Sequence, residues 1–334
     1  MYQLRGDLMS QDMMVSVICN AYNHGPYIRD ALEGFVMQQT DFPFEVLVHD
    51  DASTDNTADI IREYEAKYPE IIKPIYQTEN QYSQKVRIDR TFQIPRITGK
   101  FVAVCEGDDY WTDPMKLQKQ VDFLESHPDY SLCACSTVWQ NLKTGIMVNT
   151  GKVAQDMDIS LEELITGTKS RFFQYATILL RAEIFTDRPT WMYPFPIGDY
   201  PLTIHAALHG KVRMLSDTMC VYRYYAANSW TVRMDNDEKR AVVSRRMIEG
   251  LEALDEATAG AHHDVIQRRI LRHKYTLALM THDYTALRSG ELSKLYRSRS
   301  LLRRTSDLLR CKYPQLYATL CKPLARIIKS KYGE

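Results

Sequence analysis

Two pairs of adjacent aspartates follow apolar runs of the sequence, and they are the residues best suited to chemistry. The pair Asp50–Asp51 comes after Phe44–His49, and the pair Asp108–Asp109 comes after Phe101–Cys105. Neighbouring carboxylates repel each other unless a cation or a hydrogen-bond network offsets their charge. Mg²⁺ takes one or two protein carboxylates together with substrate phosphates, so either pair could meet a cation that accompanies a diphosphate. Each pair could instead form a turn or cap the following helix.

The pattern around these aspartates predicts alternating strands and helices. Apolar, β-branched runs predict strands over Val15–Cys19, Phe44–His49 and Ile71–Tyr76, with apolar residues at helical spacing between them. The order βαβαβ predicts an α/β fold with a mostly parallel sheet flanked by helices. Ligands of such sheets bind at the carboxyl ends of the strands, where both aspartate pairs lie. Beyond about Val232 the pattern becomes helical.

Length and composition set broad limits on the chain. A chain of 334 residues can hold one large α/β domain with an appendage. Lys and Arg balance Asp and Glu at 42 each, so the global charge indicates no partner. The seven cysteines show no metal-ligand spacing and are expected to be core residues in a reducing compartment. With neither a signal peptide nor a membrane span in the pattern, we expect a cytoplasmic protein.

The C-terminal region is strongly basic. Asp307 is the only acidic residue between Lys294 and Lys331. Arginines alternate there with leucines in the manner of an amphipathic helix, whereas no recognised nucleic-acid module surrounds them, so nucleic acid is not an expected partner. We expect these helices to pack on the catalytic domain and to present a basic face to an anionic membrane on its inner side. A merely solvated basic surface is the alternative.

The ordered motifs resemble the family-2 glycosyltransferases. The resemblance rests on Val15–Ile18 with Tyr22-Asn23, then Asp50–Asp55, then Glu106–Trp111, and it covers about residues 13–230. The stretch Cys105–Leu124 is particularly similar to bacterial members that build capsule, lipopolysaccharide O-antigen or exopolysaccharide. It implies a GT-A fold, Rossmann-like, with a C-terminal helical extension. It also implies transfer of a sugar from a nucleotide-diphosphate donor, most often a UDP-sugar, to a glycan or polyprenyl-linked glycan.

The resemblance assigns roles to residues of the nucleotide-binding half. Asp51 would accept a hydrogen bond from the nucleobase, and the loop of Ala21, Tyr22 and Asn23 would border the base. Arg87 would lie near the diphosphate, although a solvated surface position is an equal alternative. Two further aspartates would meet the Mn²⁺ or Mg²⁺ ion: Asp109 as its principal ligand, and Asp108 beside the ion or the ribose.

The expected catalytic base is Asp199. Inversion requires a carboxylate that takes the proton of the acceptor hydroxyl while that hydroxyl attacks the anomeric carbon. Many relatives carry Glu-Asp where this chain has Gly198-Asp199, and Asp199 could also cap the helix that follows. A second departure is Tyr225, which stands where relatives often place a histidine near the metal or phosphate. A phenol is a poorer metal ligand at neutral pH, so Tyr225 is expected to contact phosphate instead.

Two histidines and two rival functions complete the sequence analysis. His205 and His209 are spaced i, i+4 after Asp199, and we interpret them as helix residues near the acceptor rather than as metal ligands. A nucleotidyltransferase would show a Gly-rich, basic loop after its first strand, which Asn20–Gly25 lacks. The remaining alternative is a catalytically inactive, nucleotide-sugar-binding scaffold of an envelope polysaccharide complex.

The predicted organisation follows from these assignments. Residues 1–232 form the glycosyltransferase domain, with a nucleotide-binding half over 13–112 and an acceptor half over 113–232. Residues 233–334 form the helical, basic C-terminal region.

Overall fold

The structure, a computed structural model, describes residues 12–168, 173–226, 232 and 236–320. The chain divides into two compact units. The first unit comprises Met1–Leu164, Thr168–Arg188 and Asp199–Ser229, and the second comprises Ile165–Gly167, Pro189–Gly198 and Trp230–Glu334. Each unit is described by itself below.

The first unit begins with the predicted alternation of strands and helices. Its strands are buried because they consist of β-branched and aromatic residues, and each helix turns an apolar stripe inward. Ile28, Leu32 and Phe35, for example, recur at helical spacing and are fully buried. The elements in chain order are β1 (Val15–Ala21), α2 (Ile28–Val36), β2 (Phe44–Asp50), α3 (Thr57–Lys67), β3 (Ile72–Tyr76) and β4 (Phe101–Val104).

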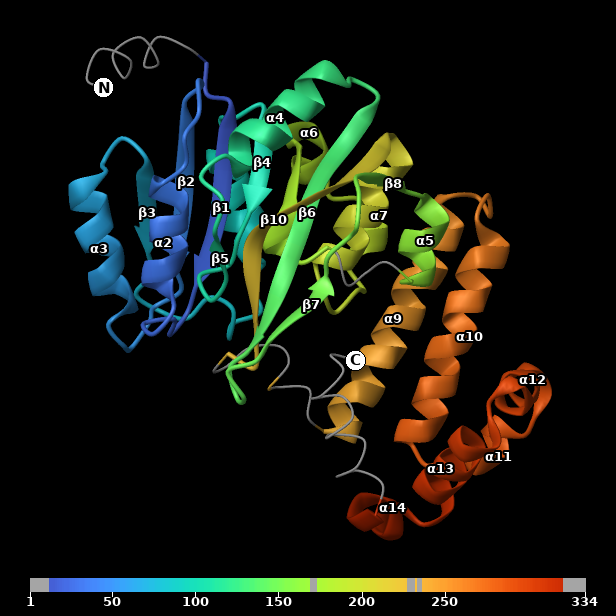
Figure 1. The fold of residues 1–334 in the computed structure, drawn as a ribbon. Coiled ribbons are helices and arrows are strands. Elements are labelled where there is room, and N and C mark those ends of the chain that lie inside the picture. Colours follow the sequence, from blue (N-terminus) through green and yellow to red (C-terminus); the bar gives the residue numbers. More distant parts are fainter. Residues whose placement is uncertain (1–11, 169–172, 227–231, 233–235, 321–334) are drawn as a thin grey trace. The chain divides into compact units, whose positions relative to one another are not determined.

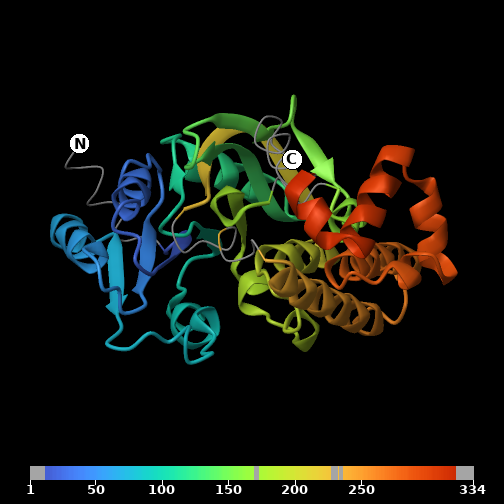
Figure 2. The same ribbon diagram turned by 90° about the horizontal axis from the view of Figure 1, so that it is seen from below.

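The first four of these strands form a parallel sheet in the order β3-β2-β1-β4. Figure 1 shows them side by side, and Figure 2 shows α2 and α3 on one side of the sheet with the segment after β3 on the other. That segment holds a π-helical turn, Asp89–Gln93, and a 3-10 turn, Ile94–Arg96, where the sequence predicts a helix toward Ile97. The carboxyl ends of β1, β2 and β4 therefore meet at one edge of the sheet.

The rest of the sheet is mixed. It continues from β4 through β9 (Ile178–Arg181), β6 (Tyr130–Asn141) and β10 (Lys211–Tyr224) to β5 (Tyr110–Trp111). Strand β6 runs parallel to β10, whereas β9 and β5 are antiparallel to their neighbours. The α/β fold with flanking helices is confirmed, and its parallel part is concentrated in the first four strands.

The remaining elements of the first unit complete this sheet or pack around it. Two short strands, which the sequence analysis did not predict, pair with β6 and β10. These strands are β7 (Met147–Gly151) and β8 (Met157–Ile159), and the helical elements are α4 (Lys116–Ser126), α5 (Leu161–Thr166), the 3-10 turn η4 (Tyr175–Thr177), α6 (Ala182–Thr186) and α7 (Asp199–His209).

The cysteines of the described residues are part of the protein interior. Cys19, Cys105, Cys133, Cys135 and Cys220 are buried and free, as the sequence predicts. The Sγ atoms of Cys135 and Cys220 are 3.9 Å apart in adjacent strands. These side chains act as small apolar residues of the sheet.

The second unit is helical in its described residues, as the pattern beyond Val232 predicts. The 3-10 turn η5 (Thr190–Met192) packs on its first long helix, and a small core of Tyr275, Leu287, Tyr296 and Cys311 joins the later ones. Its helices are α9 (Asp237–Ala257), α10 (His263–Met280), α11 (Tyr284–Leu287), α12 (Gly290–Ser298), α13 (Leu301–Lys312) and α14 (Pro314–Leu320). Residues 321–334 of the predicted basic region lie outside the described residues.

Candidate active site

The loops after β1 and β2 are joined to each other. The backbone N–H of Asp51 donates to the carbonyl oxygen of Ala21 at 2.9 Å. Asn23, with a φ of 54°, donates its backbone N–H to Ser53 Oγ at 2.9 Å and accepts from the backbone N–H of Thr54 at 2.8 Å. The predicted base-binding residues therefore belong to one hydrogen-bonded surface at the carboxyl ends of two parallel strands.

The Asp51 carboxylate is buried and held in place. Its Oδ1 accepts from the backbone N–H of Gln81 at 2.7 Å, and its Oδ2 accepts from the backbone N–H of Tyr82 at 3.0 Å. An ionised carboxylate has about four acceptor positions, so further donors can still bind it. In the loop after β1, Tyr22 is 38 % exposed, whereas Ala21 before it is buried. This loop pair presents a fixed carboxylate and an exposed aromatic ring.

The second aspartate pair lies in the turn between β4 and β5. Both side chains are buried, with Asp108 at 9 % and Asp109 at 4 % exposure. Burial, followed by the charge of Asp108, raises the pKa of Asp109 well above its usual range. The alternative of a turn is correct, because Asp109 N–H donates to the Glu106 carbonyl oxygen at 3.0 Å, but this pair does not cap the next helix, whose N-cap residue is Met115.

Arg223 on β10, to which the sequence pattern assigned no role, contacts both aspartates of the acidic turn. Its backbone N–H donates to Asp109 Oδ1 at 2.7 Å, and its guanidinium donates to the Asp108 carbonyl oxygen at 3.2 Å. The guanidinium also pairs with Asp30 and lies 4.3 Å from the ring centroid of Tyr110. A lone arginine in the apolar run of β10 was the available signal, since a buried charge needs a partner. Arg223 brings a positive charge to the acidic pair.

Gly107 lets the loop after β1 pack against the acidic turn. A Cβ atom at Gly107 would lie 2.8 Å from Ile28 Cδ1 and 2.9 Å from His24 Nδ1. The backbone N–H of Gly107 donates to the Asn20 carbonyl oxygen at 3.0 Å. Burial lowers the pKa of His24 despite the nearby charges of Asp108 and other carboxylates. A neutral imidazole therefore lies between the two acidic strand ends.

Asp199 begins α7, as predicted. The backbone N–H of Tyr200 donates to Asp199 Oδ1 at 2.7 Å. Asp199 lines a pocket together with Leu164, Phe173, Tyr200 and Thr203. Burial raises its pKa to about 6, against the effect of the backbone hydrogen bonds. A carboxyl group with this pKa changes protonation close to neutral pH, which suits a general base.

The turn η4 connects the surroundings of Asp199 with the acidic turn. Trp111, which follows the acidic pair, donates its Nε1–H to the carbonyl oxygen of Ala176 in η4 at 3.0 Å. The adjacent Tyr175 is half-buried; desolvation, followed by the charge of Asp89, raises the pKa of its hydroxyl, with smaller contributions from Asp199 and Glu106 and an opposing one from Arg188. Phe173, two residues before Tyr175, lines the Asp199 pocket.

The two remaining predicted residues are Arg87 and Tyr225. Arg87 is exposed and precedes the π-helical turn, and its carbonyl oxygen accepts from the Thr91 N–H at 2.9 Å. Tyr225 follows β10 with a φ of 67°, two residues after Arg223, and Lys143 Nζ lies 3.9 Å from its ring centroid. The assigned contacts of Arg87 and Tyr225 with the donor stay predictions.

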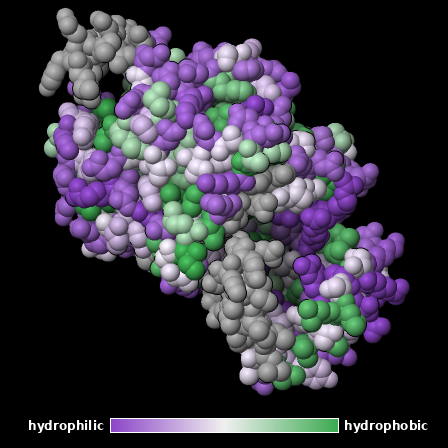
Figure 3. Space-filling view, viewed as in Figure 1, coloured by the Kyte–Doolittle hydropathy of each residue, from purple (hydrophilic) through white to green (hydrophobic). Residues whose placement is uncertain are grey.

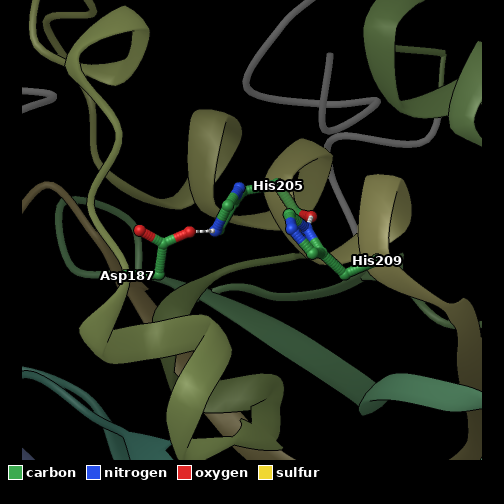
Figure 4. Close-up of side chains that lie close together, drawn as sticks. All are labelled: Asp187, His205 and His209. Atoms are coloured by element: carbon green, nitrogen blue, oxygen red, sulfur yellow. Dashed lines mark hydrogen bonds and ion pairs between the residues drawn. The ribbon is translucent and has the colours of Figure 1, made fainter.

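His205 and His209 are residues of α7, as interpreted from the sequence. His205 Nε2 lies 3.1 Å from Asp187 Oδ2, and His209 Nδ1 lies 2.8 Å from the carbonyl oxygen of His205. Burial, then the neighbouring His209, lowers the pKa of His205 to about 4. Figure 4 shows the two imidazoles and the carboxylate close together.

A protein-family model matches the part of the chain that carries the two aspartate pairs. Residues 16–189, more than half of the chain, match the family model described as glycosyl transferase family 2. The chain belongs to glycosyltransferase family 2. The family-2 match spans the strand ends that carry Asp51, Asp108 and Asp109, and it ends before Asp199.

Relatives of this family-2 chain include bacterial proteins. It is 36 % identical over 220 residues to the uncharacterized protein Rv1520 of Mycobacterium tuberculosis. The aligned stretch covers 65 % of this chain and 60 % of Rv1520. The chain therefore spans about three fifths of the length of Rv1520. Over 111 residues it is 37 % identical to the putative teichuronic acid biosynthesis glycosyltransferase TuaG of Bacillus subtilis, which covers 33 % of this chain and 42 % of TuaG.

Solved structures of similar fold support a GT-A type architecture. The S. aureus TarS fragment 1-349 in complex with UDP-GlcNAc superposes with a TM-score of 0.57 at 18 % identity, over 90 % of this chain and 79 % of that one. The mannosyltransferase PcManGT of Pyrobaculum calidifontis, in complex with GDP-Man and Mn²⁺, superposes with a TM-score of 0.53 at 16 % identity. This match covers 100 % of this chain and 94 % of that one. At such identities the likeness concerns the fold alone.

The donor set of the acidic turn fits a divalent cation. Asp108 and Asp109 offer carboxylate oxygens, the hard ligands that Mg²⁺ and Mn²⁺ prefer, and burial, followed by the charge of Asp108, raises the pKa of Asp109 despite the contacts with Arg223. Among the described residues, no third acidic, histidine or cysteine side chain joins them in a cluster. A cation bound here would therefore need oxygen ligands from a phosphate or from water.

Proposed function

We propose that this chain is an inverting, divalent-cation-dependent glycosyltransferase acting on a nucleotide-diphosphate sugar. The observation that carries the proposal is the buried pair Asp108–Asp109, bound by Arg223 at the edge of the sheet where Asp51 also lies. Mn²⁺ or Mg²⁺ held by this pair would stabilise the negative charge that develops on the departing nucleotide diphosphate.

The residues of the site would divide the work between binding and proton transfer. Asp51, held by two backbone N–H groups, would accept a hydrogen bond from the nucleobase, beside the exposed ring of Tyr22. Asp199 would take the proton of the acceptor hydroxyl, because burial places its pKa near neutrality. Support for a shared cleft comes from η4, because its Ala176 carbonyl oxygen accepts from Trp111 beside the acidic turn and Phe173 just before it lines the Asp199 pocket.

Donor hydrolysis tests this proposal. We expect one nucleotide sugar of a panel of UDP-, GDP- and dTDP-sugars to be hydrolysed in the presence of Mn²⁺. UDP-sugars are our first choice, although similar folds bind UDP-GlcNAc and GDP-Man. The alternative, an inactive nucleotide-sugar-binding scaffold, predicts Mn²⁺-dependent nucleotide binding without hydrolysis or transfer of any donor, and that result would replace the enzymatic proposal.

The pH dependence of transfer tests Asp199. The base must be ionised, so kcat/KM should fall about tenfold per pH unit below pH 6, and Asp199→Asn should lower it about 10²- to 10⁴-fold. A raised folded-state pKa stabilises the fold at low pH and loses this contribution as pH rises through about 6. Asp199→Asn should therefore unfold at a higher temperature than the parent at pH 8, with the gain absent at pH 4. Unchanged kcat/KM in this variant would exclude Asp199 as the base.

The acceptor side of the proposal is a glycan or a lipid-linked glycan of a bacterial surface polysaccharide. The similarity to TuaG, named for teichuronic acid biosynthesis, supports this context. Among the described residues, none of the helices combines the length and the apolar character needed to cross a bilayer.

The C-terminal helices supply the proposed contact with an anionic membrane. Leu301 and Leu302 at the start of α13 are 76 % and 82 % exposed, and Arg303 follows them. Figure 3 shows hydrophobic residues among hydrophilic ones over this part of the molecule. Flotation with anionic liposomes should recover the protein and should fail for Leu301→Ser with Leu302→Ser. Equal flotation of both proteins would contradict the contact.

A further inference from the structure

A cluster of three side chains lies apart from the aspartate pair, at α6 and α7. Among the described residues, Asp187, His205 and His209 are the group whose ligand atoms approach one another closely enough to hold an ion, all within 4.8 Å. We propose that they bind one divalent transition-metal ion of the zinc class, at a site separate from the predicted Mn²⁺ or Mg²⁺ site. In Figure 4, His205 lies between the other two side chains.

The helix α7 supplies two of the ligands. Residues four apart lie on the same face of an α-helix, so His205 and His209 point to the same side. Their ring centroids are 4.4 Å apart. Neutral imidazole is a ligand for Zn²⁺ and its neighbours in the transition series, whereas Mg²⁺ and Ca²⁺ prefer oxygen, so the chemistry selects the zinc class.

The hydrogen bond of His209 orients its ring for coordination. His209 Nδ1 is 2.8 Å from the carbonyl oxygen of His205, and a carbonyl can only accept, so Nδ1 carries the proton. The lone pair of His209 then lies on Nε2. Metal-bound histidines almost always donate their second ring N–H in this way, which fixes the tautomer before the ion arrives.

Asp187 supplies the third ligand from the end of α6. Its backbone N–H donates to the carbonyl oxygen of Glu183 at 3.0 Å, which fixes its position, and its Oδ2 lies 3.1 Å from His205 Nε2. The side chain is 61 % exposed, whereas that of His205 is 2 % exposed. Solvent can therefore reach the cluster on the Asp187 side, so that water can complete a tetrahedral set of two histidines and one carboxylate.

The positive charge of Arg188 acts on the cluster and would weaken the binding of a cation there. The charge of Arg188 contributes to the lowered pKa of His205. The Arg188 guanidinium, however, lies over the ring of Phe185 at 4.2 Å from its centroid. Small side-chain movements suffice to bring the three ligand atoms to the spacing of a bound ion, since Zn²⁺ binds nitrogen and oxygen at about 2.0 to 2.2 Å.

Such an ion would join α6 to α7 without belonging to the predicted reaction centre. Helix α7 begins at Asp199, so a clamp at its other end would hold the helix that carries the proposed base. Binding of Zn²⁺ does not depend on the donor or on transfer activity. The outcome therefore stands or falls separately from the proposed function.

Metal binding by untagged protein tests the site. After chelation and buffer exchange, the protein should bind one equivalent of Zn²⁺, and Co²⁺ in its place should give visible d–d absorption. The melting temperature should rise by about 5 °C at a hundredfold excess of Zn²⁺ over Kd. His209→Ala and, separately, Asp187→Asn should each weaken Zn²⁺ binding at least about tenfold. Both residues are exposed, so the melting temperature without metal should stay close to that of the parent.

Two controls make the result specific. His127→Ala removes an exposed histidine elsewhere in the first unit and should leave Zn²⁺ binding unchanged. Asp109→Asn should do the same, because it alters only the other predicted metal site. Binding of Zn²⁺ that is equally strong in His209→Ala, or absent from the parent protein at stoichiometric concentrations, would overturn the proposal.

Discussion

Two strand ends of the first unit carry the same motif, a pair of aspartates, and the structure treats them differently. After β2, backbone and side-chain donors bind the carboxylates: Asp51 accepts from Gln81 and Tyr82, and Asp50, whose pKa burial raises, accepts from Ser53 Oγ at 2.5 Å. After β4, Asp109 accepts from Arg223, and burial beside Asp108 still raises its pKa well above the usual range.

The balance between burial and hydrogen bonding distinguishes a carboxylate with a structural role from one that could bind a ligand. Asp55, in the loop after β2, is instructive because burial acts to raise its pKa, yet hydrogen bonds from Thr57 and Gly25 outweigh burial and lower it. Asp109 lacks a comparable balance. A cation is the partner that would offset the charge of the acidic turn, whereas the carboxylates after β2 are held by protein donors and Asp51 keeps acceptor positions for one more hydrogen bond.

Removal of the Asp109 charge should have the largest effect on function. Asp109→Asn keeps the shape and the hydrogen bond from Arg223 but loses the carboxylate that we propose as the principal cation ligand. We expect kcat/KM for sugar transfer to fall by about 10³-fold or more. The melting temperature without metal should rise, since a buried charge beside Asp108 is removed.

Asp122→Asn is the matched control, because Asp122 is exposed on α4 and should tolerate the change in both measurements. Loss of stability in Asp109→Asn, with activity retained, would mean that the acidic turn is structural like the loop after β2.

Replacement of Arg223 should lower the stability of the metal-free protein, whereas Asp109→Asn should raise it. Its guanidinium is 7 % exposed and offsets the acidic turn in the absence of a cation. Arg223→Gln should lower the stability of the metal-free protein by about 2 to 4 kcal/mol, because buried carboxylates lose a nearby positive charge. Mn²⁺ should then raise the melting temperature more than it does for the parent.

Arg223→Lys separates charge from geometry, since it keeps the charge but loses the planar donor pair. A Mn²⁺-dependent shift that is the same in Arg223→Gln and in the parent would show that the guanidinium and the cation do not act on the same carboxylates.

The first half of the sheet and its acidic strand ends were predictable from the sequence because their signals are local. Buried runs such as Phe44–Asp50 are continuous, and aspartates mark the point where each strand stops. Strand β10 was not predicted over its length, because polar residues around Ser216 interrupt it and its pairing with β6 shifts register there. Antiparallel pairing of β9 and β5 depends on contacts distant in the chain, which no local pattern encodes.

The same distinction applies to the site. Asp51, Asp108 and Asp109 could be selected because they follow predicted strands, and Asp199 because Gly198-Asp199 resembles the Glu-Asp position of the family. Arg223 acts through Asp109, which lies more than a hundred residues earlier, so the sequence alone gave only an unexplained charge in an apolar run. The link through Tyr175 and Trp111 likewise requires the folded chain.

We expect the smallest effect on activity for Asp55, whose carboxylate has a structural role in the loop after β2. Asp55 accepts from the backbone N–H groups of Thr57 at 3.0 Å and Gly25 at 2.9 Å, so it joins the start of α3 to the loop after β1. Asp55→Ala should cost about 1 to 2 kcal/mol of stability and change kcat/KM only a few-fold. Asp59→Ala, an exposed position in the same helix, is the control and should cost less than about 0.5 kcal/mol. If Asp55→Ala instead abolished transfer at unchanged stability, the loop after β2 would have to be counted among the reactive carboxylates, and the contrast with the acidic turn would fail.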